Sequence, residues 1–453
     1  MMKPPTMSDL AGARVLVVGL GRAGSAAARF LVRAGARVTA YDDRAGAGPA
    51  GHPVTRSPGR LAAFSLAVVS PGIPQSHPVL RRLRAARVPV VDELDLASTF
   101  LSGSLFAVTG TNGKSTTAAL IAAMLRAAGR RTFLGGNIAP GRPLSAAVGG
   151  QARDCYVVEV SSFQLERARW LRPDVALLLN ITPDHFDRHR RPVAYARCKY
   201  RLFARQRPGD RAVLNLDDPL VLPAAQVGFA GREFFTLAPR EADAGVRRGW
   251  LVAHGRRILP AREVRLRGRH NLANALAACC AVLPAGVEPE AAARVLRGFA
   301  GLPHRLEFVR SVAGVAYINN SMCTNPAAGI HSLEAVRAEA GKPVLITGGR
   351  GKRLPHGEYL DAVARLARWA VLTGENAPAL AAELVERGWN RHEVCPELAD
   401  AVRAADRRAR ALTGNSARPV AVLYSPAFAS FDQFADFQDR GRSFRREVAR
   451  LRR

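Results

Sequence analysis

Residues 106–129 read FAVTGTNGKSTTAALIAAMLRAAG, an apolar run followed by a glycine-containing turn and a long alanine-rich stretch. This order predicts a β-strand, a tight turn and an α-helix. In such a turn, the backbone N–H groups and the helix N-terminus point at a bound phosphate. Lys114 can then reach the outer phosphates of a nucleotide, and Ser115 or Thr116 can ligate Mg²⁺. Val108 stands where the complete phosphate-loop motif has its first glycine. The strand–turn–helix context still predicts a nucleoside triphosphate as the ligand.

Strand-like apolar runs alternate with helical stretches along the whole chain, in three successive blocks. This alternation predicts α/β domains with largely parallel sheets. The pattern breaks near LSGSL and near GLPH, so we expect three domains, which suits 453 residues at about 150 residues per domain. The expected domains are residues 1–103, 104–302 and 303–453. The expected strands of the first domain are 14–19, 36–43 and 88–96, with a further strand that ends at a Pro/Gly turn within LAVVSPGIP (66–74).

The composition is strongly basic, with 66 Lys and Arg against 37 Asp and Glu and a formal net charge of +29. Such an excess can indicate a nucleic acid or an anionic surface as partner. Only five of the 66 cations are lysines, however, and the arginines are spread through every segment. Replacement of Lys by Arg throughout a genome therefore explains the charge better than a nucleic-acid partner does.

Other features of the composition favour a cytoplasmic protein. The sequence contains no run of roughly 18 apolar residues, so we expect no membrane-spanning helix. The six cysteines are scattered without a C-x-x-C pair, which argues against a disulfide framework and fits a reducing compartment.

A second glycine motif lies near the N-terminus. Gly19, Gly21 and Gly24 form G-x-G-x-x-G after the first expected strand, and Asp42 and Asp43 end the second. This spacing is typical of dinucleotide-binding βαβ units. Taken alone, the motif is compatible with three interpretations. It could bind NAD, it could bind another nucleotide whose ribose or base contacts Asp42 or Asp43, or it could simply form a tightly packed βα turn. We favour a nucleotide other than NAD.

Polar side chains follow two further expected strands. Glu159 ends the run YVVEV, and Asp184, His185 and Asp187 follow the run VALLLNI. Ligands of open α/β sheets collect at the carboxyl ends of the strands. Because Mg²⁺ prefers a few carboxylates together with water and phosphate oxygens, Glu159 and His185 suit a Mg²⁺–phosphate site beside the phosphate loop.

Lys199 lies in YARCKYRLF, an expected helix. A helical lysine is usually a solvated surface residue. In a chain with 61 arginines and five lysines, a retained lysine is a candidate for chemistry that Arg cannot perform, since Arg cannot act as a neutral amine. Lys114 and Lys352 also stand in motifs.

Taken together, these segments resemble the Mur ligase family over essentially the whole chain. The resemblance rests on GTNGKST (110–116), GGNIAP (135–140), EVSSFQLE (159–166), NITPDHFDRH (180–189), YARCKYRLF (195–203), NLDD (215–218), GRHNLANALAA (268–278), GLPHRLE (301–307) and SPAFASFDQF (425–434). The segments SSFQLE, DHFDRH and SPAFASFDQF point to the glutamate-adding members.

The resemblance implies a fold and an activity. The fold would have three α/β domains: an N-terminal Rossmann-like domain for the UDP substrate, a central P-loop ATPase-like domain with a mainly parallel sheet, and a C-terminal Rossmann-like domain for the amino acid. The activity would be ATP-dependent addition of D-glutamate to UDP-N-acetylmuramoyl-L-alanine through an acyl phosphate, in peptidoglycan precursor synthesis. ATP and two Mg²⁺ are the implied cofactors. We expect a cytoplasmic monomer with no nucleic-acid partner and no membrane insertion.

The resemblance also implies roles for individual residues. The ATP-binding set is Gly110, Thr111, Asn112, Gly113, Lys114, Ser115, Thr116, Asn274, Arg305 and Asn320. The UDP-substrate set is Gly21, Arg22, Asp42, Arg44 and Gly72, with Asn137, Ser161 and Gln164 at the pyrophosphate and muramoyl end. The glutamate set is Thr324, Lys352, Ser425 and Phe431. The metal set is Ser115, Glu159, His185 and Lys199, the last as a carbamate, and the catalytic set is Lys114, Lys199, His185 and Glu159.

One segment departs from the family. At NNSMCTN (319–325) many family members have D-S-K-A-T-N, so Asn320 replaces an acid thought to hold the ribose and Met322 replaces a lysine. An anion and a cation are lost together, which keeps the local charge and indicates a compensated variant. The change leaves the stereochemistry of the glutamate open.

Three alternatives to D-glutamate addition therefore remain. An L-glutamate-adding ligase would share every motif. A folylpolyglutamate synthase-like ligase would share the phosphate loop but not an N-terminal nucleotide domain. An NAD-dependent oxidoreductase would use only the N-terminal glycines.

Overall fold

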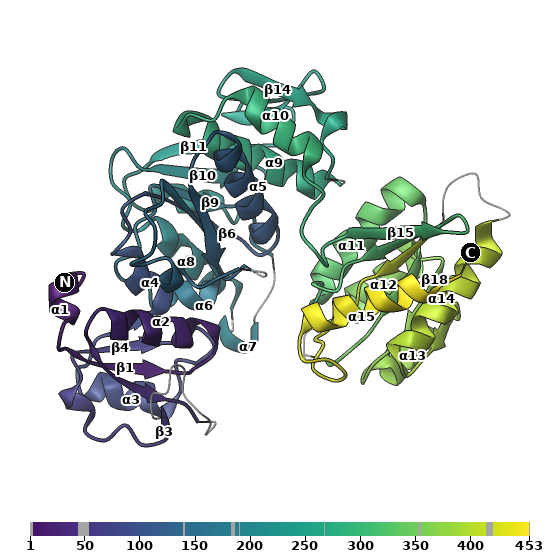
Figure 1. Cartoon of the computed structure of the whole chain (residues 1–453). Helices are drawn as coiled ribbons and strands as arrows, with labels where there is room; N and C mark the ends of the chain where they lie inside the picture. Colours follow the sequence, from purple (N-terminus) through teal and green to yellow (C-terminus); the bar gives the residue numbers. More distant parts are fainter. Residues whose placement is uncertain are drawn as a thin grey trace. The chain divides into compact units, whose positions relative to one another are not determined.

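The described strands form three separate β-sheets, which follow one another along the chain (Figure 1). The structure is a computed structural model that describes residues 3–43, 54–138, 141–182, 186–189, 191–266, 268–351, 355–413 and 420–452. Its contacts define two compact units, one of residues 1–265 with 270–299 and one of residues 266–269 with 300–453. The first two sheets belong to the first unit, and the third sheet belongs to the second.

The first sheet has five parallel strands in the order β3-β2-β1-β4-β5. Its domain contains α1 Met7–Leu10, β1 Arg14–Val18, α2 Arg22–Arg33, β2 Arg37–Tyr41, β3 Val54–Thr55, β4 Leu66–Val69, α3 Pro78–Ala85, β5 Val90–Asp92 and α4 Glu93–Ser98. Along β1, Val15 and Val17 pack with α2 and α4 on one face, whereas Leu16 and Val18 pack with α3 on the other. Both faces of this strand are buried, which explains its unbroken apolar sequence.

The prediction of a strand over residues 88–96 is wrong for residues 93–96, which are helical. Strand β5 ends at Asp92, and α4 begins at the next residue. The Asp92 side chain accepts a hydrogen bond from the Leu94 N–H at 3.0 Å and so caps the helix. The alternating acids and leucines of DELDL have the pattern of a strand, but an Asp followed by Glu also starts a helix.

The second sheet carries the phosphate-loop motif. Its nine strands lie in the order β14-β13-β12-β11-β10-β9-β6-β8-β7. The strands are β6 Ser104–Thr109, β7 Thr132–Gly136, β8 Cys155–Glu159, β9 Val175–Leu178, β10 Arg211–Asn215, β11 Gly231–Phe235, β12 Ala244–Arg247, β13 Trp250–Ala253 and β14 Arg256–Pro260. The helices are α5 Lys114–Ala127, α6 Ser162–Leu165, α7 Phe186–His189, α8 Pro192–Tyr200, α9 Arg269–Val282 and α10 Pro289–Gly298. Strands β6 to β11 pair in parallel, and β12, β13 and β14 form an antiparallel meander at one edge.

The third sheet has the order β15-β16-β20-β17-β18-β19, with only β15 antiparallel to its neighbour. The strands are β15 Glu307–Val312, β16 Val315–Asn319, β17 Val344–Thr347, β18 Trp369–Leu372, β19 His392–Val394 and β20 Val420–Tyr424. The helices are α11 Pro326–Ala340, α12 Gly357–Leu366, α13 Ala377–Glu386, α14 Leu398–Thr413 and α15 Phe437–Arg450. Helices α11, α12 and α13 share a core on one face, and α14 and α15 share a core on the other. The expected α/β class with mainly parallel sheets is confirmed.

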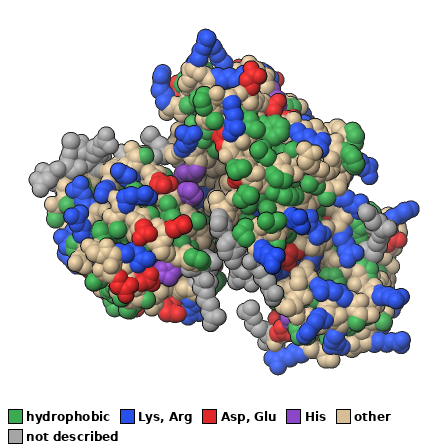
Figure 2. Space-filling model, turned by 180° about the vertical axis from the view of Figure 1, so that it is seen from behind, with side chains coloured by type: hydrophobic (Ala, Val, Ile, Leu, Met, Phe, Trp, Pro, Cys, Tyr) green, Lys and Arg blue, Asp and Glu red, His purple; other side chains and the backbone are tan. Residues whose placement is uncertain are grey.

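The basic residues are dispersed over the surface. On the face shown in Figure 2, Lys and Arg side chains are scattered over all visible parts of the molecule, with acidic and apolar side chains between them. Within the described ranges, no helix is both long enough and apolar enough to cross a bilayer.

Buried acids join the first two domains within the first unit. Asp92, Glu93 and Asp95 are 0%, 1% and 1% exposed. A Glu93 carboxylate oxygen accepts the Ser145 N–H at 2.6 Å, and the Asp95 carboxylate accepts three successive N–H groups of residues 169–171 at 2.7–2.9 Å. Burial raises the pKa of all three carboxyls, that of Glu93 to about 7. The link between the two domains is therefore sensitive to pH.

The substitution Glu93→Gln tests this pH sensitivity. Burial disfavours the ionised carboxylate, so the free energy of unfolding is highest below the ordinary pKa of 4.5 and falls as the pH rises to about 7. A pKa change of this size corresponds to about 3 kcal/mol. Gln keeps an acceptor for Ser145 and cannot ionise. In urea unfolding, we expect the variant to match the wild type near pH 4.5 and to exceed it by up to about 3 kcal/mol near pH 8.

The matched control is Glu241→Gln, at an exposed position of the same unit. It should leave the pH dependence unchanged. Equal pH dependence in wild type and Glu93→Gln would contradict the assignment.

Candidate active site

The phosphate loop connects β6 to α5 through a turn that requires glycine. Gly110 has φ +151° and Gly113 has φ +83°, values that L side chains rarely adopt. Gly113 is the N-cap of α5, and because it has no side chain, no side-chain cap covers the first turn of the helix. The N–H groups of this turn point outward from the helix start, an arrangement suited to phosphate.

Asn180, just after β9, holds the loop in this shape. Its Oδ1 accepts the Asn112 N–H at 2.8 Å, and its Nδ2 donates to the Asn112 carbonyl at 3.1 Å. The neighbouring Thr111 N–H donates to the Asn180 carbonyl at 2.9 Å. Asn180 was not among the residues expected at the site, although it follows an apolar strand just as Glu159 ends one.

Glu159 lies at the end of β8, beside the phosphate loop. It is 3% exposed, and its backbone pairs with Val108 of β6. Ser115 Oγ donates to Glu159 Oε2 at 2.5 Å, and Asn137 Nδ2 donates to Glu159 Oε1 at 2.8 Å. A hydroxyl and a carboxylate side by side are oxygen donors of the kind that Mg²⁺ prefers, so these residues fit a magnesium site.

Two lysines from different helices meet at the Gly110 carbonyl. Lys114 Nζ donates to the carbonyls of Gly110 at 3.1 Å and Thr111 at 2.8 Å. Lys199 of α8 is 1% exposed, and its Nζ donates to the same Gly110 carbonyl at 2.7 Å. This Nζ also lies 4.5 Å from the centroid of the Tyr195 ring. The Lys114 ammonium, beside outward-pointing backbone N–H groups, attracts a polyanion such as a triphosphate.

Asn274 of α9 also reaches the loop. A Cβ on Gly113 would lie 2.3 Å from Asn274 Oδ1, so Gly113 is required for this close approach as well as for its φ. Asn274 Nδ2 donates to Asn271 Oδ1 at 3.1 Å. The structure thus brings together the loop, Glu159, Lys199 and Asn274, as the sequence analysis expected.

Cys198, the neighbour of Lys199, is not a nucleophile. Its thiol donates to the Ser162 carbonyl at 3.0 Å, and burial raises its pKa to about 12. The thiol stays protonated at neutral pH and lacks the nucleophilicity of a thiolate.

Among the described residues expected to bind UDP, Gly21, Asp42 and Gly72 lie just past the carboxyl ends of β1, β2 and β4. The strand order changes direction between β1 and β4, and such a switch point is where open α/β sheets bind ligands. Gly72 follows β4, and Gly21 is the N-cap of α2. Asp42 Oδ2 accepts the Leu20 N–H at 2.7 Å, so this acid also holds the glycine turn in place.

Three more residues of the UDP-substrate set have partners in the structure. Arg22 donates to the Gly141 carbonyl. Ser161 and Gln164 form a capping box around the start of α6. Arg44 of the UDP set, His185 of the metal set and Lys352 of the glutamate set lie outside the described residues.

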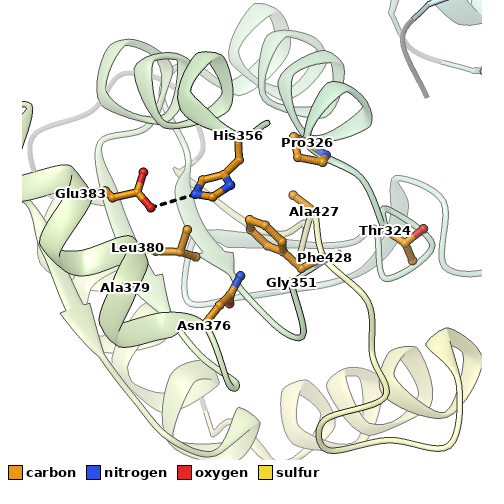
Figure 3. Close-up of a pocket in the computed structure, with 10 residues that line it drawn as sticks. All are labelled: Thr324, Pro326, Gly351, His356, Asn376, Ala379, Leu380, Glu383, Ala427 and Phe428. Atoms are coloured by element: carbon orange, nitrogen blue, oxygen red, sulfur yellow. Dashed lines mark hydrogen bonds and ion pairs between the residues drawn. The ribbon is translucent and has the colours of Figure 1, made fainter. Parts of the chain in front are cut away.

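A cavity of about 110 Å³ lies in the second unit (Figure 3). Thr324, expected to bind glutamate, lines it together with Gly351, His356, Glu383 and Phe428, among others. His356 Nε2 lies 2.8 Å from Glu383 Oε1, and the His356 ring meets the Phe428 ring edge-on.

The two other described residues of the expected glutamate set do not line this cavity. Ser425 is fully buried and accepts a hydrogen bond from Asn320 Nδ2 at 3.2 Å, whereas Phe431 is 62% exposed. Asn320 also donates to Ser332 Oγ at 2.6 Å. Asn320 thus joins β16 to α11 in a buried polar network.

Two arginines shape the segment that departs from the family motif. Arg305 Nε and a terminal nitrogen lie 3.2 Å and 2.9 Å from the Met322 sulfur. Arg440 is 2% exposed and donates to the Ser321 carbonyl at 2.8 Å and to the Phe428 carbonyl at 3.0 Å. Arg440 could not be predicted from the sequence, because no motif distinguishes it from the other arginines of so basic a chain.

Known proteins match the chain over nearly its full length. The family model for the Mur ligase middle domain matches residues 108–282, that for the Mur ligase glutamate ligase domain matches 304–414, and that for the MurD-like N-terminal domain matches 13–92. The UDP-N-acetylmuramoylalanine–D-glutamate ligase of Pelotomaculum thermopropionicum is 41% identical over 470 residues, covering 98% of this chain and 99% of that protein. The enzyme of the same name from Myxococcus xanthus is 42% identical over 466 residues, with the same coverage.

Solved structures show the same fold at low identity. The UDP-N-acetylmuramate-alanine ligase of Thermotoga maritima has a TM-score of 0.62 at 19% identity and covers 96% of this chain and 99% of that chain. The folylpolyglutamate synthase of Mycobacterium tuberculosis has a TM-score of 0.62 at 18% identity, with 79% and 94% covered.

Asn180→Ala tests the clamp on the phosphate loop. The substitution removes both hydrogen bonds to Asn112, each worth about 1 kcal/mol, so the loop loses its pre-formed shape. We expect the Kd for ATP, measured by calorimetry, to rise about tenfold, which corresponds to about 1.4 kcal/mol.

Asn215→Ala is the matched control for this measurement. Asn215 is also an asparagine at a strand end, and its Nδ2 donates to the Leu179 carbonyl rather than to the loop. An unchanged Kd in Asn180→Ala, or equal losses in both variants, would contradict the role given to Asn180.

Proposed function

The chain belongs to the Mur ligase family, and we propose from this that it joins D-glutamate to UDP-N-acetylmuramoyl-L-alanine in an ATP-dependent reaction. The full-length relatives that carry this activity in their names support the choice of substrates. The match of residues 13–92 to a MurD-like N-terminal domain supports it over a folylpolyglutamate synthase-like activity. The observation that carries the chemistry is the convergence of Lys114, Lys199 and the Ser115–Glu159 pair on the Gly110 turn.

The reaction needs activation of a carboxylate, which is a poor electrophile. A carboxylate oxygen of the UDP substrate attacks the γ-phosphorus of ATP, the bond from that phosphorus to the bridging oxygen breaks, and ADP leaves. The amine of glutamate then attacks the carbonyl carbon of the acyl phosphate and loses a proton. Phosphate departs with one oxygen of the original carboxylate, and an amide remains.

The phosphate loop would position the triphosphate for this attack. Its outward-pointing N–H groups bind phosphate oxygens, and the Lys114 ammonium offsets the negative charge of the outer phosphates. Phosphoryl transfer needs little covalent chemistry from the protein. Positioning of the reactants and electrostatic stabilisation of the transition state therefore account for most of the catalysis. Asn274, Arg305 and Asn320 would contact the rest of the nucleotide.

We place magnesium at the same loop. Ser115 and Glu159 would hold one Mg²⁺ ion. His185 and carbamylated Lys199 would supply the further ligands that a second Mg²⁺ ion needs. Bound Mg²⁺ would offset the repulsion between the two anionic reactants. The carbamate proposal rests on the chemistry of Lys199: the amine of a lysine can take up CO₂ whereas the guanidinium of an arginine cannot, and this lysine is retained and buried beside the loop.

The remaining assignments follow the three domains, which we propose to end at residues 103, 302 and 453. Gly21, Arg22, Asp42, Arg44 and Gly72 would bind UDP, and Asn137, Ser161 and Gln164 the pyrophosphate and muramoyl end. Thr324, Lys352, Ser425 and Phe431 would bind glutamate. We further propose that the chain acts as a monomer in the cytoplasm and binds no nucleic acid.

The first test compares the two isomers of glutamate. Purified full-length chain is incubated with ATP, Mg²⁺ and UDP-N-acetylmuramoyl-L-alanine, and phosphate release is followed. We expect release above the no-glutamate control with D-glutamate and none with L-glutamate. Release with L-glutamate alone would favour the alternative isomer, and release with neither would refute the proposal.

The second test concerns Lys199. We expect Lys199→Ala to lose activity by about 100-fold or more, which corresponds to roughly 3 kcal/mol of activation free energy. Lys199→Arg should be equally impaired, because Arg keeps the charge and cannot form a carbamate. Added acetate should partly restore Lys199→Ala.

Lys342→Ala, at an exposed lysine, is the control and should match the wild type. Substantial activity in Lys199→Arg would show that Lys199 acts as a simple cation and would end the carbamate proposal.

A further inference from the structure

Three potential metal-binding side chains meet in the central domain, at the edge of the sheet beyond β10. Glu233 lies on β11, His254 lies in the turn between β13 and β14, and Cys280 lies on α9. One ligand atom from each lies within 4.8 Å of the other two. We propose that these residues form a Zn²⁺ site, separate from the phosphate loop.

The distances suit a tetrahedral zinc ion. Cys280 Sγ lies 3.7 Å from Glu233 Oε2, and His254 Nε2 lies 3.7 Å from the same oxygen. With Zn–S, Zn–N and Zn–O bonds of about 2.3, 2.0 and 2.1 Å, tetrahedral angles separate such ligand atoms by roughly 3.4–3.6 Å. A small inward shift of the side chains would bring all three to zinc, and a water molecule would take the fourth position.

Arg211 orients the carboxylate for this task. Its Nε lies 3.5 Å from Glu233 Oε1, the oxygen that does not face the histidine. The second oxygen, Oε2, is the one near both His254 and Cys280. A partner on the far oxygen of a ligating carboxylate is common around metal sites and fixes the direction of the ligand.

The proposed zinc site is open to solvent on one side, because two of its three side chains are partly exposed. Cys280 is fully buried, whereas the side chains of Glu233 and His254 are 14% and 24% exposed. Sulfur, imidazole nitrogen and carboxylate oxygen together favour zinc over Mg²⁺ and Ca²⁺, which prefer oxygen ligands alone.

Zinc would replace two protons of the present hydrogen-bond network. His254 Nε2 lies 3.0 Å from the Cys280 carbonyl, and the Cys280 thiol faces the Glu233 carboxylate. On binding, the thiol proton would pass to solvent as the Zn–S bond forms. The proton that His254 Nε2 donates to the Cys280 carbonyl would leave Nε2, and the neutral imidazole would carry its one proton on Nδ1 instead. No oxidant or reductant is needed.

The site would tie the β13–β14 hairpin to α9. Asn274, which approaches Gly113 of the phosphate loop, stands on α9 six residues before Cys280. Zinc would therefore stabilise the helix that supports one side of the nucleotide site without contacting the nucleotide itself.

Cobalt(II) serves as the probe, because it takes zinc sites and its bond to a thiolate gives a charge-transfer absorption band. Metal-free full-length chain is titrated with Co²⁺ and then with Zn²⁺ as competitor. We expect the band in the wild type and in the matched control Cys279→Ser, whose thiol is the buried chain neighbour of Cys280. Cys280→Ser should lack the band. No band in the wild type, or an equal band in Cys280→Ser, would overturn the proposal.

A second variant keeps the test valid if Cys280→Ser does not fold. His254 has φ +49°, and Asn tolerates this conformation well, so His254→Asn keeps the turn. We expect His254→Asn to retain the wild-type circular dichroism and to bind Zn²⁺ about tenfold or more weakly, a loss of about 1.4 kcal/mol or more. Unchanged zinc affinity in this variant would also refute the site.

Discussion

The buried carboxylate of Glu159 is the contact on which the nucleotide site depends. It is 3% exposed, and its two oxygens accept hydrogen bonds from Ser115, at the start of α5, and from Asn137, just after β7. A buried carboxylate without such partners would be costly. These two bonds therefore fix the helix N-terminus, the turn after β7 and the end of β8 relative to one another, and they hold an oxygen donor beside the loop.

The phosphate loop and the site around it were predictable because their signals are local or follow from parallel topology. A strand, a glycine turn and a helix are contiguous in the sequence, and the carboxyl ends of parallel strands lie at one edge of a sheet, which placed Glu159 beside the loop. Lys199 was selected by the scarcity of lysine, and the structure brings it to the same carbonyl as Lys114.

Other features depend on contacts that the sequence does not encode locally. The hydrogen bond that caps α4 decided between a strand and a helix at 93–96. The meander of β12, β13 and β14 consists of short strands that lack a strong alternation, and pairing with one another defines them. Asn180 and Arg440 act through hydrogen bonds to backbone groups far away in the chain. Ser425 belongs to a matched motif, yet the structure buries it against Asn320.

In the proposed reaction, ATP activates the carboxylate of the UDP substrate as an acyl phosphate. Oxygen-18 transfer tests it most directly: UDP-N-acetylmuramoyl-L-alanine labelled in both carboxylate oxygens is converted with ATP and D-glutamate, and the products are weighed by mass spectrometry. With an acyl phosphate as intermediate, we expect the released phosphate to carry one labelled oxygen and the amide to keep the other. Release of unlabelled phosphate together with the amide product would show that no acyl phosphate forms. It would also contradict the proposal that the Gly110 turn positions ATP for attack by the substrate carboxylate.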